Sequence, residues 1–402
     1  MMKYGILIAL AMFTGQLKAQ HTLTGKIVDT GRDAIPYASI QLQSEAKGTL
    51  ANEQGEFSLV VPALPALIQV SHLGYESVVV EAKNDNTFVV ELQRSAVVLK
   101  EIAVSADYPY HLMKQAFEKA RRERANTHYG KAFFRQKTQS DSLFTEFSES
   151  FYEVKFSSKG IDSWFIENGR YARRKGEKGD YLFSFTNYSY LTGGFLFYQE
   201  KIKDLILPVN PAVDKYYDLE IRNYIQSDNG ELAEVYCTPR APYKNNAMEG
   251  SVFINTTTFA LQSIRGCFKN AWGVTFADKD IEVKDPLICF DIAFRNDHHH
   301  GTTVLDYMQV DTRLRYAKSD VFEKIAHVNS VLIFYQIQKQ QTEEKFEKVR
   351  RKVKDIDTIK KVKYNPAFWK NNAIIKRLPD EEKAIEAFEA ANSFGNYFNN
   401  PN

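Results

Sequence analysis

The run Asp297-His298-His299-His300-Gly301 contains the residues best suited to chemistry, because carboxylate and imidazole groups are common metal ligands. Consecutive histidines point in different directions, so an extended segment would put only Asp297 and His299 on a shared face. No second cluster in the sequence completes a coordination shell. We therefore favour a hairpin tip, keep Asp297 and His299 as the metal candidates, and expect no cofactor.

Other polar patterns predict solvated surfaces rather than reaction centres. Asp278, Asp280 and Glu282 alternate as calcium ligands do, but they lack the glycine and the distant glutamate of a calcium loop. His72 has no ligand at metal-binding spacing, so we interpret it as a polar side chain at a strand end. The nucleophile turn G-x-S-x-G, the zinc motif H-E-x-x-H and the nucleotide-binding glycine motifs are all missing from the sequence. These patterns favour a non-catalytic protein.

An aromatic segment with two glycines runs from residue 188 to residue 198. Tyr188, Tyr190, Phe195 and Phe197 are the candidates for contact with a ligand or partner, since this segment could form a lid over an apolar cavity. The alternative is a surface loop whose aromatic side chains cover the sheet.

Composition indicates a sheet-rich globular protein of two or three domains. The chain has 402 residues, with 52 Lys and Arg against 50 Asp and Glu, so the net charge of +2 argues against a nucleic-acid binder. Its 28 Phe and 22 Tyr are many, and aromatic side chains favour strands. Residues 1–19 have a lysine, a short apolar run and a small residue before a cut, which predicts a signal peptide and export. No later stretch is apolar for long enough to form a transmembrane helix.

Short strands separated by turns fill residues 21–105, a spacing that predicts a seven-stranded β-sandwich. The stretches 25–28 (GKIV), 35–40 (IPYASI), 47–49 (KGT), 53–57 (EQGEF) and 70–76 (VSHLGYE) together resemble the carboxypeptidase-regulatory-like domain of exported Bacteroidetes-type envelope proteins. The resemblance implies a prealbumin-like sandwich that carries no catalytic residues.

A linking helix is expected over 107–127, with Asp107 as its cap and one buried stripe. The stripe consists of Met113, Ala116, Phe117 and Ala120. Alternating patterns over 129–340 predict a curved antiparallel sheet or half-barrel with one apolar face. Its last strand should place Val331, Ile333, Tyr335 and Ile337 on a single face.

Residues 341–402 should form a basic segment and a C-terminal helix. Residues 339–363 carry ten basic and five acidic side chains, so we expect an exposed, mobile connector there. Trp369 and Phe388 should pack on the sheet rather than on a ligand. Three cysteines, Cys237, Cys267 and Cys289, are interpreted as apolar core thiols, although a bridge from Cys267 to either of the others is open.

Together these patterns predict a mainly β protein, exported to the periplasm or outer membrane. The leading hypothesis is a non-catalytic cell-envelope protein that binds an apolar ligand or an envelope partner, such as a lipid or an outer-membrane protein. A structural protein–protein interaction module and a hydrolase with an unrecognised site are the alternatives. Neither the oligomeric state nor the identity of the ligand follows from the sequence.

Overall fold

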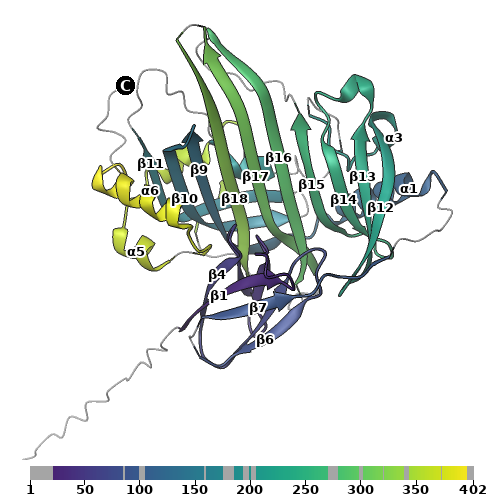
Figure 1. The fold of residues 1–402 in the computed structure, drawn as a ribbon, viewed down its shortest axis with the longest axis horizontal. Helices are drawn as coiled ribbons and strands as arrows, with labels where there is room; N and C mark the ends of the chain where they lie inside the picture. The colour runs from purple at the N-terminus through teal and green to yellow at the C-terminus, as the bar shows by residue number, and fades with distance from the viewer. Residues whose placement is uncertain are drawn as a thin grey trace, which may run out of the picture.

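The computed structural model describes residues 21–84, 87–98, 105–157, 160–174, 185–192, 199–200, 205–269, 279–297, 302–319, 321–338, 344–372 and 374–395. The expected signal peptide at residues 1–19 lies outside these ranges. Within them the chain is mainly β, as predicted, and consists of a small sandwich attached to one large antiparallel sheet (Figure 1).

Seven short strands build the N-terminal sandwich, as the turn spacing predicted. One sheet contains β4 (Glu56–Val61), β1 (His21–Asp29) and β7 (Phe88–Leu92). The other contains β3 (Lys47–Leu50), β2 (Ser39–Leu42), β5 (Ala66–Ser71) and β6 (Val78–Ala82). Buried and less buried residues alternate along β4 and β5, so each strand contributes one face to the shared core.

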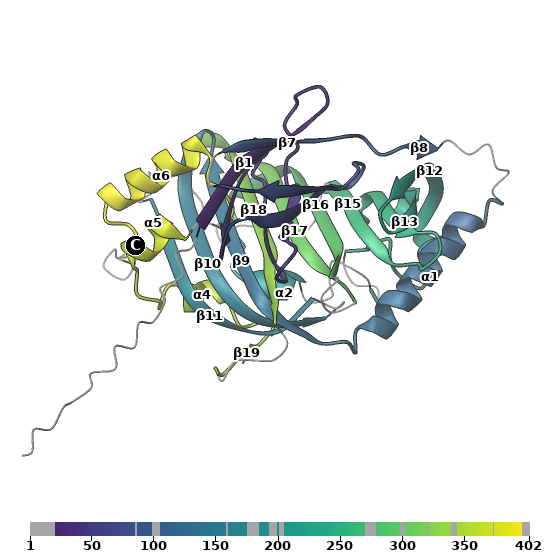
Figure 2. The same ribbon diagram turned by 90° about the horizontal axis from the view of Figure 1, so that it is seen from below.

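Twelve further strands form the large sheet, in which every neighbouring pair is antiparallel. In spatial order they are β19 (Glu347–Lys348), β11 (Gly160–Arg173), β10 (Leu143–Ser157), β9 (His128–Ser140), β18 (Phe322–Gln338), β17 (Thr302–Lys318), β16 (Ile281–Asp297), β15 (Leu261–Lys269), β14 (Glu249–Asn255), β13 (Gly230–Pro239), β12 (Tyr217–Ser227) and β8 (Val97–Val98). The sheet is strongly curved (Figures 1 and 2). One bridge, between Lys47 of β3 and Gln336 of β18, joins the sandwich to it.

The large sheet is covered on both faces along its centre, which differs from the single apolar face that we expected. The inner face carries Phe134 and Leu332, and it packs against α1 (Tyr108–Glu123), α2 (Tyr188–Thr192), α3 (Val213–Tyr216) and α4 (Asp355–Ile359). The outer face carries Phe133 and Ile333, and it packs against the sandwich and the C-terminal segment.

The last long strand changes faces near its end. Val331, Ile333 and Tyr335 belong to the outer cluster as predicted, but Ile337 belongs to the inner core. The register between β18 and β9 shifts between Phe334 and Gln336, so Tyr335 is an extra residue. A β-bulge of this kind reverses the side-chain alternation beyond it, which strict alternation cannot predict.

The buried stripe of the linking helix and the packing of the tail aromatic residues are as predicted. Met113, Ala116, Phe117 and Ala120 are all buried on α1, which runs from 108 to 123. Asp107 precedes the first turn but makes no side-chain capping bond. Trp369 of α5 (Pro366–Asn371) packs on the outer face beside Phe151, and Phe388 of α6 (Pro379–Ala390) belongs to a second outer cluster with Phe147.

The basic segment before these helices does not form a simple exposed connector. Part of it pairs with β11 as β19, and α4 buries Asp355, Ile356 and Ile359 on the inner face. Our expectation of an exposed connector therefore holds for most of the described residues of this segment but is wrong for α4. Charged residues dominate the composition of this segment, but the three buried side chains of α4 are enough to hold this short helix against the sheet.

The cysteines also depart from the favoured interpretation. Cys267 of β15 and Cys289 of β16 lie directly opposite each other and form a disulfide, with Cα atoms 4.0 Å apart. Cys237 remains a buried thiol whose pKa is raised by burial. The sequence left open whether Cys267 pairs with Cys237 or with Cys289, and the strand register selects Cys289.

Candidate functional site

The sequence-predicted site residues do not come together in the described part of the structure. Tyr188 is buried and stacks on Phe134 with ring centroids 3.6 Å apart, while Tyr190 is half-buried. Phe195 and Phe197 lie outside the described residues. Asp297 ends β16, its side chain is not described, and His299 also lies outside. A ligand role for these residues therefore remains a prediction.

Two cavities on the inner face are small. One beneath Tyr188 measures about 10 Å³, and another between α1 and the ends of β9, β15 and β17, beside His128, measures about 30 Å³. Ligand pockets typically measure about 300–1,000 Å³. These two cavities therefore give no support to a bound apolar ligand.

A larger pocket lies where the sandwich meets the outer face of the large sheet; at about 140 Å³ it is also below the usual range of ligand pockets and has room only for a small molecule. The sandwich contributes the loop residues Tyr37, His72 and Tyr75 to its wall, whereas the large sheet contributes Arg265 and Tyr307. We call this cavity the junction pocket. Since its two walls come from different parts of the fold, it exists only when the sandwich is docked.

Two β-bulges supply polar groups to the junction pocket. Between β14 and β15 the register shifts so that Gln262 is an extra residue, and between β16 and β17 the extra residue is Asp306. Both residues line the pocket. Bulges redirect side chains and are common next to functional sites. At both bulges the regular alternation of side chains between the two faces is broken, and a polar side chain lines the pocket there.

The charges around the junction pocket are paired. Nε of Arg295 donates to Asp306 at 2.8 Å, and Nε of Arg265 donates to Asp291 at 3.1 Å. Burial raises the pKa of Asp306, while its ion pair with Arg295 opposes that change. A pocket built in this way presents guanidinium donors without a large excess of positive charge.

His72 contributes a polar atom that lacks a partner. Its Nδ1 is buried and has no hydrogen bond to any described residue. Burial and, to a smaller extent, the nearby Arg265 lower the pKa of the imidazole to about 4 against an opposing backbone hydrogen bond at Leu73, so the ring is neutral at ordinary pH. An unpaired buried polar atom costs about 1–3 kcal/mol, and of the eight such side-chain atoms among the described residues only this one lines the junction pocket. The sequence interpretation of His72 as a residue at a strand end is consistent with its position after β5.

Tyr37 forms a strained wall of the same pocket. Its φ of 57° lies in the left-handed region, which side chains other than glycine rarely adopt. Its hydroxyl donates to Glu53 at 3.2 Å and accepts from Nε2 of Gln309 at 2.8 Å, and its ring lies 6.2 Å from the Tyr307 ring. Strained backbone clusters at functional sites, where neighbouring contacts hold it in place.

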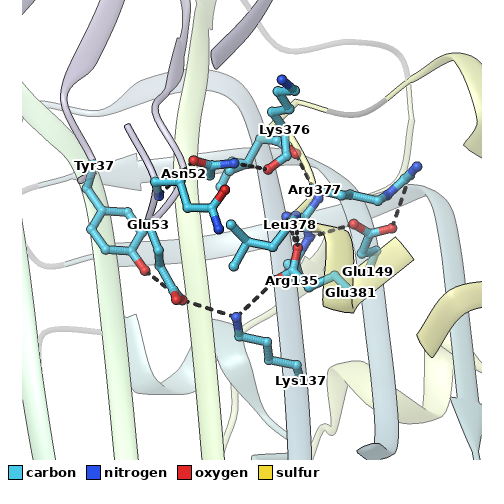
Figure 3. Close-up of polar contacts among 12 residues, drawn as sticks. Tyr37, Asn52, Glu53, Arg135, Lys137, Glu149, Lys376, Arg377, Leu378 and Glu381 are labelled. Carbon is cyan, nitrogen blue, oxygen red and sulfur yellow. Dashed lines mark hydrogen bonds and ion pairs between the residues drawn. The ribbon is translucent and has the colours of Figure 1, made fainter. Parts of the chain in front are cut away.

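A chain of ion pairs leads from Tyr37 to the C-terminal segment (Figure 3). Glu53 contacts Lys137 at 3.1 Å, and Lys137 contacts Glu381 of α6 at 3.0 Å. Arg135 then joins Glu381 at 3.2 Å to Glu149 at 2.7 Å. We call these five charged residues the clasp, because they tie the sandwich, the sheet and the tail together.

Glu149 is the most deeply buried member of the clasp. It is 0 % exposed and also accepts two bonds from Arg170, at 2.8 and 2.5 Å, while Arg377 lies 3.7 Å away. Burial alone would raise its pKa, but Arg170, Arg135 and Arg377 outweigh burial and lower it to about 2. The carboxylate is therefore committed to three cations, which suits a structural role better than proton transfer.

Sequence reasoning missed the junction pocket and the clasp. Their members lie far apart in the chain, for example Tyr37 and Gln309, and no motif connects them. Among the described residues, no group of three His, Cys, Asp or Glu side chains converges as a metal site requires. In the same ranges, every helix is too short or too polar to cross a membrane.

The fold and the pocket define a two-module β protein in which a seven-stranded sandwich is docked on a large curved sheet. Residues 23–104 match the family model of the CarboxypepD_reg-like domain, which confirms the resemblance of the N-terminal strands and covers about a fifth of the chain. No curated protein gives a significant match to the chain.

Two solved structures match the chain at low identity. One is a DUF1329 family protein from Desulfovibrio piger ATCC 29098, which is 10% identical and has a TM-score of 0.22; the match covers 59% of this chain and 95% of that one. The other is a protein of unknown function, thought to be membrane-associated, from Bacteroides fragilis NCTC 9343. It is 11% identical, with a TM-score of 0.16, and the match covers 79% of this chain and 98% of that one.

Proposed function

We propose that this chain is an exported, non-catalytic protein of the cell envelope that binds a small polar ligand in the junction pocket. The single observation that carries the proposal is the buried, unpaired Nδ1 of His72 in a pocket already lined by polar side chains. Buried polar atoms without partners are costly, and a ligand that donates or accepts a hydrogen bond there would remove that cost.

The geometry of the pocket supports the same proposal. It lies between two modules, which is a common place for ligand sites. Two bulges bring Gln262 and Asp306 to it, and Tyr37 holds a strained conformation in its wall. The residues gathered there can donate and accept hydrogen bonds, but their charges are engaged with one another. Recognition rather than bond cleavage fits such a site.

An envelope location is supported by the predicted signal peptide and by the N-terminal domain, which resembles those of exported envelope proteins. Fractionation of cells that produce the full-length chain, beside a variant starting at residue 21, tests this part. We expect the full chain in the envelope fraction and the shortened chain in the cytoplasm. Equal distribution of the two proteins would contradict export.

Ligand binding is tested by the thermal stability of the purified chain in a panel of sugars, amino acids, nucleosides and small carboxylates. We expect at least one solute to raise the midpoint of unfolding, because a ligand that binds the native state stabilises it. The variants Gln262→Leu and Arg265→Met should lose this response. Arg313→Met is the matched control, since Arg313 also lies on the outer face but outside the pocket. Binding that both pocket variants retain would refute the site.

A second candidate function is docking on an envelope protein through the sandwich edges. Val79 of β6 and Val89 of β7 are 53% and 55% exposed, and in the described ranges each strand pairs with a single neighbour. Open edges of this kind can pair with another chain. Cross-linking in cells should then capture a partner at Val79 or Val89 positions that carry a photoreactive residue. The same photoreactive residue at the exposed Arg313, away from both edges, should capture no partner, and equal capture there would contradict docking through the edges.

A further inference from the structure

The balance of charge in the junction pocket restricts its ligand. Arg295 is paired with Asp306, Arg265 is paired with Asp291, and the exposed Asp228 lies at the rim. An anion or a cation would have to compete with these pairs or leave one of them uncompensated. A neutral ligand meets no such penalty.

The polar groups in the pocket carry donors and acceptors side by side. The amides of Gln69, Gln262 and Asn296 each present one carbonyl oxygen and one NH₂ group, although Gln262 and Asn296 already donate one NH₂ hydrogen to Phe294 and to Asn229, both at 2.6 Å. Adjacent hydroxyl groups on a ring can donate to the first and accept from the second. Nδ1 of His72 adds a further buried polar atom that is unsatisfied among the described residues.

Aromatic rings complete the wall. Tyr37, Tyr75 and Tyr307 line the pocket, and the first and last are neighbours. Aromatic side chains combine a flat apolar surface with a hydroxyl group, which suits a ligand with both C–H faces and polar edges. The volume of about 140 Å³ accommodates about one six-membered ring with its substituents rather than a long chain. A peptide would instead seek the open edge of a strand.

We propose that the ligand of the junction pocket is a neutral saccharide unit, held by amide and guanidinium groups at its hydroxyls and by tyrosine rings at its faces. This inference rests on the proposed function, because it names the chemical class of the ligand for the same pocket. His72 acts as a ligand-binding residue whose ring must turn to bring its unpaired nitrogen to the saccharide, because that nitrogen is buried beside the pocket.

The test uses the chain from residue 20 to 402 and six probes. Glucose, galactose, mannose and N-acetylglucosamine represent neutral saccharides, while triglycine and inorganic phosphate represent the competing chemistries. Saturation-transfer NMR detects binding and calorimetry measures its affinity. We expect at least one sugar to bind and neither competing probe to bind in the pocket.

The variant His72→Phe separates a binding role from a structural one. Phenylalanine keeps the edge contact with the Tyr75 ring, which lies 5.5 Å from the His72 ring, but it removes the unpaired nitrogen. We expect sugar affinity to fall at least tenfold while the midpoint of unfolding stays the same or rises. His327→Phe is the control, because His327 contacts Asp311 outside the pocket and should not affect affinity. Gln262→Leu replaces His72→Phe if that variant does not fold.

The outcomes distinguish the two proposals. Sugar binding that His72→Phe or Gln262→Leu weakens and His327→Phe leaves intact supports the saccharide inference. Binding of triglycine or phosphate alone, lost in Arg265→Met, overturns the saccharide inference but retains a polar-ligand pocket. Sugar binding that no pocket variant changes overturns the assignment to this site. If none of the probes binds, the saccharide inference fails, and the panel of polar solutes decides the broader proposal.

Discussion

Neutralising Glu149 should be one of the most damaging single changes in the outer face of the sheet. In Glu149→Gln the side chain keeps its size but loses its charge. Arg135, Arg170 and Arg377 would then remain in a region from which water is largely excluded, without their shared carboxylate. Removing one partner of a buried ion pair costs about 3–5 kcal/mol, because the remaining charge is uncompensated.

The pKa of Glu149 gives a second, independent value for the free energy that its carboxylate contributes to folding. Its value of about 2 in the folded chain lies below the ordinary 4.5. One pKa unit corresponds to about 1.4 kcal/mol, so the ionised form contributes about 3 kcal/mol at neutral pH. Because the folded pKa is lowered, this contribution is present above pH 4.5 and is lost as the pH falls toward 2. At pH 3 about 1 kcal/mol of it should remain.

Urea unfolding of wild-type and Glu149→Gln protein at pH 7 and pH 3, followed by circular dichroism, measures the effect. The difference in free energy of unfolding should be about 3 kcal/mol at pH 7 and about 2 kcal/mol smaller at pH 3. Glu386→Gln, an exposed glutamate on α6, is the control and should change stability by less than about 0.5 kcal/mol. A loss below about 1 kcal/mol at pH 7, or a loss of equal size at both pH values, would refute the reasoning.

Three further predictions test other parts of the fold. Replacing Cys267 and Cys289 by serine should lower the free energy of unfolding by about 3 kcal/mol, because the bridge spans 22 residues, and wild type in reductant should match the variant in a urea titration. The carboxyl of Asp355 should titrate with a pKa of about 6 in carbon-13 spectra, because burial outweighs the hydrogen bonds that it accepts. The contribution of its protonated form to stability is complete below about pH 4 and is lost as the pH rises through 6. Asp355→Asn should remove this pH dependence. Glu53→Gln should cost less than about 1 kcal/mol in the same titration, because Glu53 is 43% exposed and its pairing with Lys137 is screened by water; a larger loss would contradict this view.

Local patterns in the sequence were sufficient where neighbouring residues decide the structure. The spacing of short strands and turns over residues 21–105 predicted the sandwich, and the helical spacing of Met113, Ala116 and Phe117 predicted the buried stripe of α1. These features depend on the backbone periods of 2.0 and 3.6 residues, which can be read from a short window. The sequence also predicted that Trp369 and Phe388 of the tail pack on the sheet, because large aromatic side chains gain most from burial.

Only the tertiary structure decided which distant residues meet. Gln262 and Asp306 enter the junction pocket because each is an extra residue in its strand, and a bulge depends on the partner strand as much as on its own sequence. The pairing of Arg135 with Glu149 and the choice of Cys289 as partner of Cys267 likewise depend on register. A single-residue shift would send each of these side chains to the opposite face of the sheet. The sequence thus determined the elements and their buried residues, whereas the register and the docking of the sandwich created the pocket on which the proposed function depends.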